Sequence, residues 1–276
     1  MRINRSLLIA LFLLFLGLIQ LIVHTNPEPS SLAYTTYGTG ESVLIALHGS
    51  PGSKDNFALL APLIENHTMY ALDMNGFGDS PSNVPNYGIK AQAEALNTFM
   101  VLHNISHSSL LGYSWGGGVM FEYAHLYPEK VDTLISLSGM GVQEGELTGN
   151  YYLEHIRSLV SCPFVVYYPG AFIVSRPYSL DNPLHYLPTS GHRKGFVRSF
   201  IDTDQRPLYA QLQTITVPTL VLSGDKDTIV PLWVGALHAS LLPQARHEVY
   251  QGPHHQLTQD PTEIAKHINT FLHENK

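Results

Sequence analysis

The stretch Gly112-Tyr113-Ser114-Trp115-Gly116 places one hydroxyl on a turn between two predicted elements. Residues 108–111 before it read as a buried strand, and residues 117–124 after it have helical character. A strand that turns directly into a helix around a serine holds that serine in a strained backbone conformation. The positions two residues away on either side must then be very small, and both are glycine. The pattern predicts that the Ser114 hydroxyl is exposed at the end of a strand.

Composition limits the function classes that fit this chain. Its 276 residues suffice for one large α/β domain with an insertion. Lys and Arg number 15 against 22 Asp and Glu, a net charge of −7, and no basic cluster lies beyond the N-terminus, which argues against a nucleic-acid partner. A single cysteine, Cys162, excludes an intramolecular disulfide and a cysteine zinc site. His103 and His107 alone would make a poor metal site, so no metal or organic cofactor is predicted.

The N-terminus carries an apolar segment. Arg2 and Arg5 precede residues 6–23, a run close to the length needed to span a bilayer and without a good small-x-small cleavage site. We expect residues 1–25 to be an uncleaved signal anchor that places the catalytic domain outside the cytoplasm. The competing prediction is a cleaved signal peptide and a secreted or periplasmic protein. Residues 26–33 read as a short proline-rich linker.

Strand and helix patterns alternate after the linker, which predicts a mostly parallel central sheet with helices on both faces. We assign this α/β core to residues 34–140 and 212–276. The alternation fails in residues 141–211, an aromatic-rich stretch that reads as a mainly helical lid insertion. The predicted strands are 43–47, 68–72, 108–111, 131–137, 219–222 and 247–250, and the predicted helices include 56–64, 89–102 and 262–272.

A serine hydroxyl needs a base to remove its proton, and the base needs a third group to fix its tautomer. Partners for Ser114 should lie at the carboxyl ends of later strands, at the same edge of the sheet. Asp225 and Asp227 follow the predicted strand 219–222, and the adjacent His254 and His255 follow the last strand. The chain thus presents serine, aspartate and histidine in the order of the α/β-hydrolase arrangement.

From about Tyr34 to its C-terminus the chain resembles the α/β-hydrolase superfamily. The sequence His48-Gly49-Ser50-Pro51-Gly52 is similar to the family's His-Gly loop, and residues 73–80 are similar to its Asp-x-x-Gly-x-Gly-x-Ser loop. The serine turn, the Gly-x-x-Asp step at residues 224–227 and a late histidine complete the set in the correct order.

The resemblance implies a role for each matching residue. Ser114 would be the nucleophile, Asp227 the orienting acid and a late histidine the base. The oxyanion hole would consist of the backbone N–H groups of Trp115 and Ser50, and each such donor contributes about 3–4 kcal/mol to catalysis. His48 and Asp73 are expected to be structural, and Asp225 is the weaker candidate for the acid.

The choice of base rests on spacing. The family often shows Gly-x-Gly-His with an acid five residues later, which selects His255, preceded by Gly252 and followed by Asp260. Counting back from Pro261 favours His254 instead. Neighbouring side chains point in different directions, so only one of the two histidines can serve Ser114, and we select His255.

Serine at position 114 argues against the family branches that have aspartate at this turn, the dehalogenases and epoxide hydrolases. Gly-x-Ser-Trp-Gly also occurs in proline iminopeptidases, but these pair it with His-Gly-Gly-Pro-Gly, whereas Ser50 replaces the middle glycine here. The resemblance therefore implies a serine hydrolase that cleaves a small to medium, apolar carboxylic ester or related lipid-like substrate. The alternatives are an iminopeptidase-like enzyme, a carbon–carbon bond hydrolase, or a non-catalytic binding protein.

Overall fold

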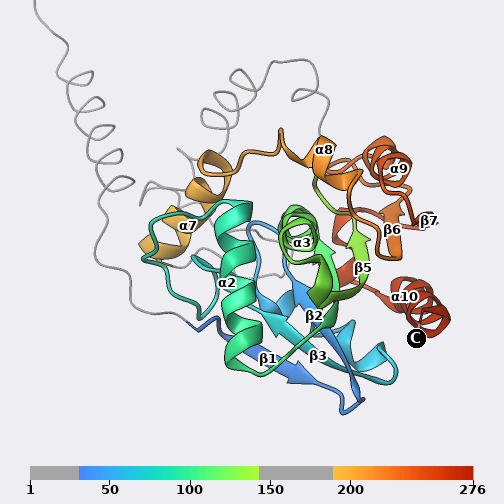
Figure 1. The fold of residues 1–276 in the computed structure, drawn as a ribbon, viewed down its shortest axis with the longest axis horizontal. Helices are drawn as coiled ribbons and strands as arrows, with labels where there is room; N and C mark the ends of the chain where they lie inside the picture. Colours follow the sequence, from blue (N-terminus) through green and yellow to red (C-terminus); the bar gives the residue numbers. More distant parts are fainter. Residues whose placement is uncertain (1–30, 143–188, 276) are drawn as a thin grey trace, which may run out of the picture.

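The structure is a computed structural model that describes residues 31–142 and 189–275 (Figure 1). Seven strands in this part of the chain form one sheet in the order β1-β3-β2-β4-β5-β6-β7. Only β1 runs antiparallel to its neighbour, and each of the other pairings is parallel. The strands are β1 (Tyr34–Tyr37), β2 (Ser42–Leu47), β3 (His67–Leu72), β4 (Ser108–Tyr113), β5 (Val131–Leu137), β6 (Thr219–Gly224) and β7 (Ala245–Tyr250).

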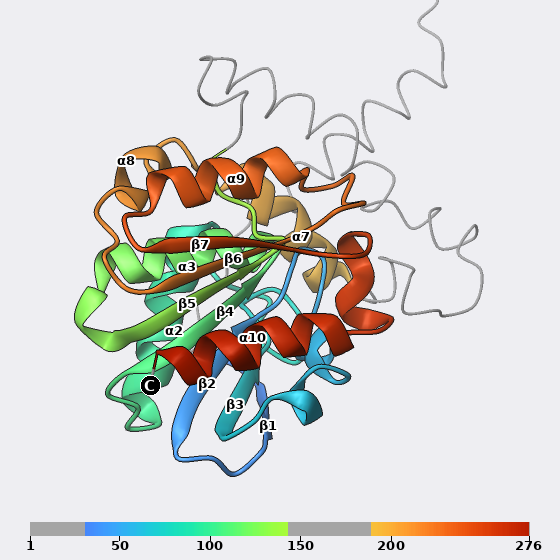
Figure 2. The same ribbon diagram turned by 90° about the vertical axis from the view of Figure 1, so that its right-hand side faces the viewer.

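Helices cover both faces of the sheet. On one face lie α2 (Ile89–Leu102), α3 (Trp115–Leu126), α8 (Leu208–Leu212) and α9 (Leu232–Leu241), while α7 (Ser190–Ile201) packs against the loop between β3 and α2. The opposite face carries α10 (Thr262–Glu274) and three short 3₁₀ helices, η1 (Lys54–Phe57), η2 (Ala61–Leu63) and η6 (His254–Thr258). A fourth, η3 (Pro128–Lys130), links α3 to β5. Figure 2 shows α10 across the sheet from α2 and α3.

The central strands β2, β4, β5 and β6 are largely apolar on both sides because each face of the sheet is buried there. Side chains alternate between the faces along a strand, so Leu110 and Leu111 of β4 enter different cores. Leu110 packs with α2 and α3, and Leu111 packs with α10. The continuous apolar runs in the sequence therefore reflect a doubly covered parallel sheet.

The predicted fold class is confirmed, and the predicted strands all form. The single helix predicted over residues 56–64 is wrong, because η1 and η2 are separate short 3₁₀ turns. Pro62 lies in the first turn of η2, where it has no N–H to continue a helix from the preceding residues. The sequence analysis did not identify β1, a short edge strand with alternating exposure, or α9.

Several predictions fall outside the described residues, including the N-terminal segment 1–25 and residues 143–188 of the insertion. The division into anchor, linker, core and insertion stays a prediction. Of the insertion, the structure describes α7 and the start of α8, which are helical as expected. Among residues 31–142 and 189–275, no helix combines the length and apolar character that crossing a membrane requires.

The close approach of α3 to β2 depends on glycine. A Cβ atom built on Gly116 would lie 2.3 Å from the Leu47 carbonyl oxygen and 2.7 Å from that of His48. Gly118, two residues later in the same helix, has room, since its Cβ would meet nothing closer than Ile89 Cγ2 at 3.4 Å. Within the first turn of α3, the Gly116 position therefore packs against backbone, whereas the Gly118 position faces a side chain.

A buried histidine fixes the point where the chain enters the insertion. His238 of α9 is fully buried, packs edge-on against Phe121 and accepts a 3.1 Å hydrogen bond at Nε2 from the Val142 N–H. Burial, with a smaller contribution from His247, lowers the pKa of His238 to about 4. The imidazole is neutral at neutral pH, as an accepting Nε2 requires.

Replacing Gly116 by alanine should lower the free energy of unfolding by about 2 kcal/mol or more, because backbone cannot move aside as a side chain can. Gly118→Ala is the matched control on the same helix. It should leave stability unchanged or raise it by up to about 1 kcal/mol through the helix preference of alanine. Urea unfolding of the two variants measures this difference, and equal destabilisation would contradict the packing described for α3.

His238 should make stability depend on pH. Between its ordinary pKa of 6.5 and its folded value of about 4, the unfolded chain binds a proton that the folded chain does not. The free energy of unfolding of the wild type should therefore fall, relative to His238→Gln, by up to about 1.4 kcal/mol per pH unit on acidification through this window. Urea titrations at several pH values test the difference, and parallel pH curves would refute it.

Candidate active site

The parallel sheet brings the candidate residues to one edge. Ser114 follows β4 directly, Asp227 lies three residues after β6, and His254 lies four residues after β7. His48 follows β2 and Asp73 follows β3 at the same edge. Because these strands are parallel, their carboxyl ends meet on one side of the sheet, as is usual for sites in open α/β folds.

The Ser114 turn has the strained geometry that the sequence predicts. Ser114 has φ 51° and ψ −122°, a conformation that non-glycine residues seldom adopt. Its N–H donates to the Leu137 carbonyl at 3.1 Å, and its own carbonyl accepts from Met140 N–H at 2.7 Å. On the flanks, a Cβ on Gly112 would lie 2.6 Å from the Gly116 carbonyl oxygen. The requirement for small residues around Ser114 is therefore confirmed, but the predicted exposure is wrong, because Ser114 is buried.

Ser114, His254 and Asp227 form a continuous hydrogen-bonded chain. His254 Nδ1 lies 2.7 Å from Asp227 Oδ2, and His254 Nε2 lies 3.0 Å from Ser114 Oγ. A carboxylate can only accept, so Nδ1 carries the proton and Nε2 is free to accept from the serine hydroxyl. This is the arrangement of a nucleophile, its base and the group that orients the base.

The selection of His255 as the partner of Ser114 is wrong in this geometry, because His254 occupies that position. His254 begins η6 and its side chain is buried, whereas the next residue, His255, is exposed. The ring planes of the two histidines are 83° apart, and Nδ1 of His255 lies beside the Tyr113 hydroxyl. The alternative count back from Pro261 selects His254, the residue that contacts both Ser114 and Asp227.

The Asp227 carboxylate is fully buried and kept charged by its surroundings. Burial raises its pKa, but the hydrogen bond and the charge of His254, the Val230 N–H and the Ser138 hydroxyl outweigh that effect and lower it. Oδ1 accepts from the N–H groups of Ile229 at 2.9 Å and Val230 at 2.8 Å. Both carboxylate oxygens thus have hydrogen-bond partners, which fixes the orientation of the Asp227 carboxylate toward His254.

His48 holds the loop that contains Ser50, as expected. Its Nδ1–H donates to the Gly49 carbonyl at 2.6 Å, and its Nε2 accepts from the Met74 N–H at 3.0 Å. Burial lowers its pKa, consistent with a neutral ring that donates at one nitrogen and accepts at the other. A Cβ built on Gly49 would lie 3.0 Å from Ser114 Cβ, so this loop passes directly beside the serine.

The oxyanion hole of Ser50 and Trp115 backbone N–H groups stays a prediction. Two features are compatible with it: the loop of Gly49 adjoins Ser114, and Trp115 is the first residue of α3. The first N–H groups of a helix have no partner within the helix and attract negative charge.

Asp73 is structural, as expected. Its carboxylate accepts from the backbone N–H groups of Lys54 at 2.7 Å and Asp79 at 2.9 Å and forms an ion pair with Lys54 Nζ. Burial disfavours the charged form of Lys54. The hydrogen bonds that Lys54 makes to Asp73 and Asp79 outweigh this effect and raise the pKa of Lys54. The cluster links the loops that follow β2 and β3.

The remaining candidates take local roles. Exposed Asp225 accepts from the Gly252 N–H at 2.7 Å and so joins the loops after β6 and β7. His107 pairs with Asp132, and His103 packs against Phe99. The described residues contain no group of three or more histidine, cysteine or acidic side chains that could hold a metal ion.

Two supporting serines were missed by the sequence analysis. Ser138 hydrogen-bonds Asp227, and fully buried Ser199 of α7 lies 3.0 Å, Oγ to Oγ, from Ser50. Ser199 donates its hydroxyl hydrogen to the Phe196 carbonyl at 2.7 Å, so the Ser50 hydroxyl donates to Ser199. Both contacts join distant parts of the chain, and no local pattern could have revealed them.

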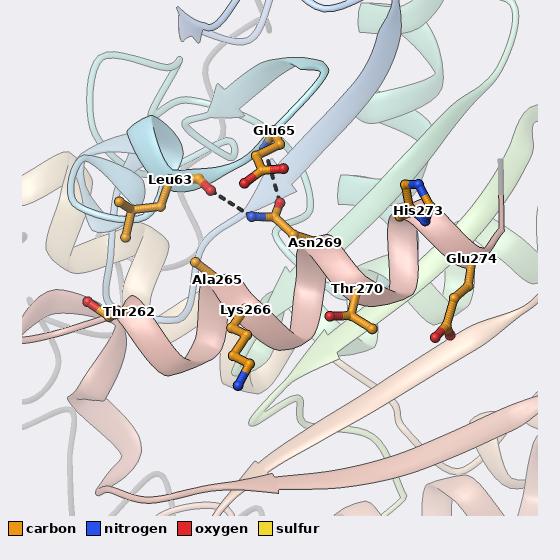
Figure 3. Close-up of a pocket in the computed structure, with 9 residues that line it drawn as sticks. All are labelled: Leu63, Glu65, Thr262, Ala265, Lys266, Asn269, Thr270, His273 and Glu274. Atoms are coloured by element: carbon orange, nitrogen blue, oxygen red, sulfur yellow. Dashed lines mark hydrogen bonds between the residues drawn. The ribbon is translucent and has the colours of Figure 1, made fainter.

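A separate groove with a volume of about 550 Å³ lies between α10 and the η2–β3 connection (Figure 3). Asn269 spans it, accepting from the Glu65 N–H at 3.0 Å and donating to the Leu63 carbonyl at 2.8 Å. None of the three residues of the hydrogen-bonded chain lines it, and we assign it no part in the candidate site.

Comparisons with known proteins agree with the fold. A family model described as alpha/beta hydrolase fold matches residues 42–154. A thermophilic esterase from Thermogutta terrifontis superposes with a TM-score of 0.72 over 91% of this chain and 97% of its own, at 21% identity. A bacterial membrane phospholipase A superposes with a TM-score of 0.68 over 96% of this chain and 91% of its own, at 27% identity.

Curated relatives are equally distant. Lipase 3 of a Moraxella species is 26% identical over 75% of this chain and 69% of its own. A 2-hydroxy-6-oxononadienedioate/2-hydroxy-6-oxononatrienedioate hydrolase of a Pseudomonas species is 26% identical over 77% of this chain and 81% of its own. Sequence similarity at this level extends to enzymes of more than one reaction class.

Substituting the two adjacent histidines separates their contributions. His254→Ala should reduce the rate at which a fluorophosphonate labels Ser114 by at least about a thousandfold, because the serine loses its base. His255→Ala should reduce the rate by less than about tenfold, since it leaves the base in place. Labelling rates of the purified variants decide between them, and the reverse ranking would restore His255 as the base.

Proposed function

Because this α/β-hydrolase fold protein aligns Ser114, His254 and Asp227, we propose that it is a serine hydrolase that cleaves carboxylic esters. The observation that carries the proposal is the pair of hydrogen bonds at 3.0 Å and 2.7 Å that joins Ser114 Oγ to Asp227 through His254. A serine with only a structural role in the turn would need neither a base nor a buried carboxylate beside it.

In the first half-reaction, Ser114 Oγ attacks the ester carbonyl as His254 Nε2 takes the hydroxyl proton. Asp227 holds Nδ1–H and stabilises the imidazolium that forms. The tetrahedral intermediate collapses when His254 gives its proton to the departing alkoxide, which leaves as an alcohol. The acyl group remains bound to Ser114 as an ester.

In the second half-reaction, His254 removes a proton from water, and the resulting hydroxide attacks the acyl-enzyme carbonyl. Collapse of the second intermediate returns the proton to Ser114 Oγ and releases the carboxylic acid. The backbone N–H groups of Ser50 and Trp115 would hold the negative oxygen in both intermediates. This reaction cycle requires no metal or organic cofactor.

We propose a small to medium, apolar acyl ester as the substrate. Aromatic side chains are frequent in the insertion 141–211, and apolar pockets in hydrolases bind acyl chains by excluding water from them. The names of the lipase and phospholipase among the similar proteins are compatible with lipid-like esters.

We further propose that residues 1–25 anchor the catalytic domain to the membrane on its non-cytoplasmic side, or direct its secretion if they are cleaved. The apolar run 6–23 and the preceding Arg2 and Arg5 support this proposal. Fractionation of cells that express the full chain tests it. An anchored protein stays with the membrane until detergent is added, a cleaved one is soluble and shorter, and a full-length soluble protein would refute both forms.

Carbon–carbon bond hydrolysis is the second candidate, favoured by the similarity to the Pseudomonas hydrolase of an oxononadienedioate. That chemistry also fits a Ser-His-Asp arrangement. It differs in its substrate, which for that relative is by name a hydroxy-oxo dicarboxylate, the enol form of a diketone acid. An apolar ester carries no such charge, so the two candidates can be separated by substrate charge.

The decisive experiment is fluorophosphonate labelling of the wild type beside Ser114→Ala. Labelling should occur in the wild type and disappear in the variant, because only an activated serine attacks the probe. A panel of aryl esters of increasing acyl length, a proline arylamide and a charged diketone acid then sorts the reaction classes. We expect turnover of the esters at least about a hundredfold above the amide.

A folded wild type that takes up no probe would refute activation of Ser114 and favour the non-catalytic binding protein. Preferred cleavage of the arylamide would instead favour an iminopeptidase-like enzyme, and preferred cleavage of the diketone acid would favour a carbon–carbon bond hydrolase.

A further inference from the structure

Tyr113, the residue before Ser114, makes two kinds of contact with His254. Its ring stacks on the His254 ring with centroids 5.3 Å apart and planes 31° apart. Its hydroxyl donates to the His254 backbone carbonyl at 3.1 Å. The side chain is almost fully buried. One residue therefore touches both the ring and the backbone of the proposed base, from the strand end that carries the nucleophile.

His255 completes this arrangement. Its Nδ1 lies 3.3 Å from Tyr113 Oη. A carbonyl oxygen can only accept, so the hydroxyl hydrogen of Tyr113 points to His254, and the hydroxyl oxygen is left to accept from His255 Nδ1–H. The donors run in one direction, from the His255 ring through the Tyr113 hydroxyl to the His254 carbonyl.

The loop that carries His254 is hydrogen-bonded to the ends of two strands. The residues before it are held by Asp225, which accepts from the Gly252 N–H at 2.7 Å, and by Lys226, whose N–H donates to the Gly252 carbonyl at 3.1 Å. These bonds fix the loop to β6 and hence to Asp227. The bonds of Tyr113 fix the same loop to β4 and hence to Ser114.

We propose that Tyr113 and His255 are positioning residues that hold His254 in line between Ser114 and Asp227. This inference rests on the proposed function, because it concerns the rate of the reaction at Ser114. Neither residue exchanges a proton with the substrate. Small displacements of a catalytic group lower the rate strongly, so a restraint on the backbone of the base matters for turnover.

The test uses three variants and one control in the full-length protein. Tyr113→Phe keeps the ring over His254 and removes only the hydroxyl. His255→Ala removes the donor to that hydroxyl, and His255→Asn replaces it with a side-chain amide that can donate from a similar position. His107→Ala, at an exposed histidine hydrogen-bonded to Asp132, is the matched control.

The measurements are the rate constant for fluorophosphonate labelling of Ser114 and the kcat and KM for p-nitrophenyl butyrate. Tyr113→Phe should lower labelling and kcat about tenfold with KM changed less than about twofold, and His255→Ala should lower them about fivefold. His255→Asn should restore most of this loss, and the control should match the wild type. The double variant Tyr113→Phe/His255→Ala should be no slower than Tyr113→Phe, because both act through one hydroxyl.

The failures of the two proposals are distinguishable. Absence of labelling in the wild type would refute the serine hydrolase itself. Normal labelling of the wild type with unchanged kcat in Tyr113→Phe and His255→Ala would refute the positioning role alone. Equal loss in His255→Ala and His255→Asn would also refute it. Should Tyr113→Phe fail to fold, the comparison of the two exposed His255 variants still decides.

Discussion

The strained backbone at Ser114 is the constraint on which the site depends. A residue with φ 51° and ψ −122° costs about 1–3 kcal/mol and persists only where its surroundings fix it. Leu137 and Met140 hold its backbone by hydrogen bonds, and Gly112 and Gly116 let strand, helix and loop approach without a side chain between them. This geometry directs the serine oxygen to the imidazole and places the beginning of α3 beside it.

The second requirement is a charged carboxylate that is buried away from solvent. An unpaired buried charge would be strongly destabilising. Asp227 avoids that cost because its oxygens accept from Ile229, Val230 and His254, so the carboxylate remains ionised inside the protein. A carboxylate fixed on two sides in turn fixes the tautomer of His254, which leaves Nε2 as the acceptor for Ser114. The electrostatics of the site thus follow from the turn after β6, three residues beyond the strand.

The sequence predicted those parts of the site that depend on local geometry. Ser114 was identified because glycines must flank a strand-to-helix turn, and Asp227 was preferred to Asp225 because residues 224–227 resemble the family's Gly-x-x-Asp step. The choice between His254 and His255 depends on how the loop after β7 turns. That turn is fixed by Asp225 and Tyr113, from two other strands, and spacing within the loop carries no trace of either contact. The helix expected over residues 56–64 failed for a local reason, since Pro62 interrupts it.

In the proposed enzyme, the sheet loops would align the catalytic groups and the predicted insertion would select the substrate, yet the two parts are physically connected. The hydrogen-bonded chain at Ser114 is built entirely from loops of the sheet, so its geometry does not require the insertion. The insertion nevertheless reaches the site, because Ser199 of α7 accepts from the hydroxyl of Ser50 in the loop beside the serine. Ser50 is also a predicted oxyanion donor. A change in α7 that removes this hydrogen bond would therefore shift Ser50, and with it the predicted oxyanion donor of the proposed reaction.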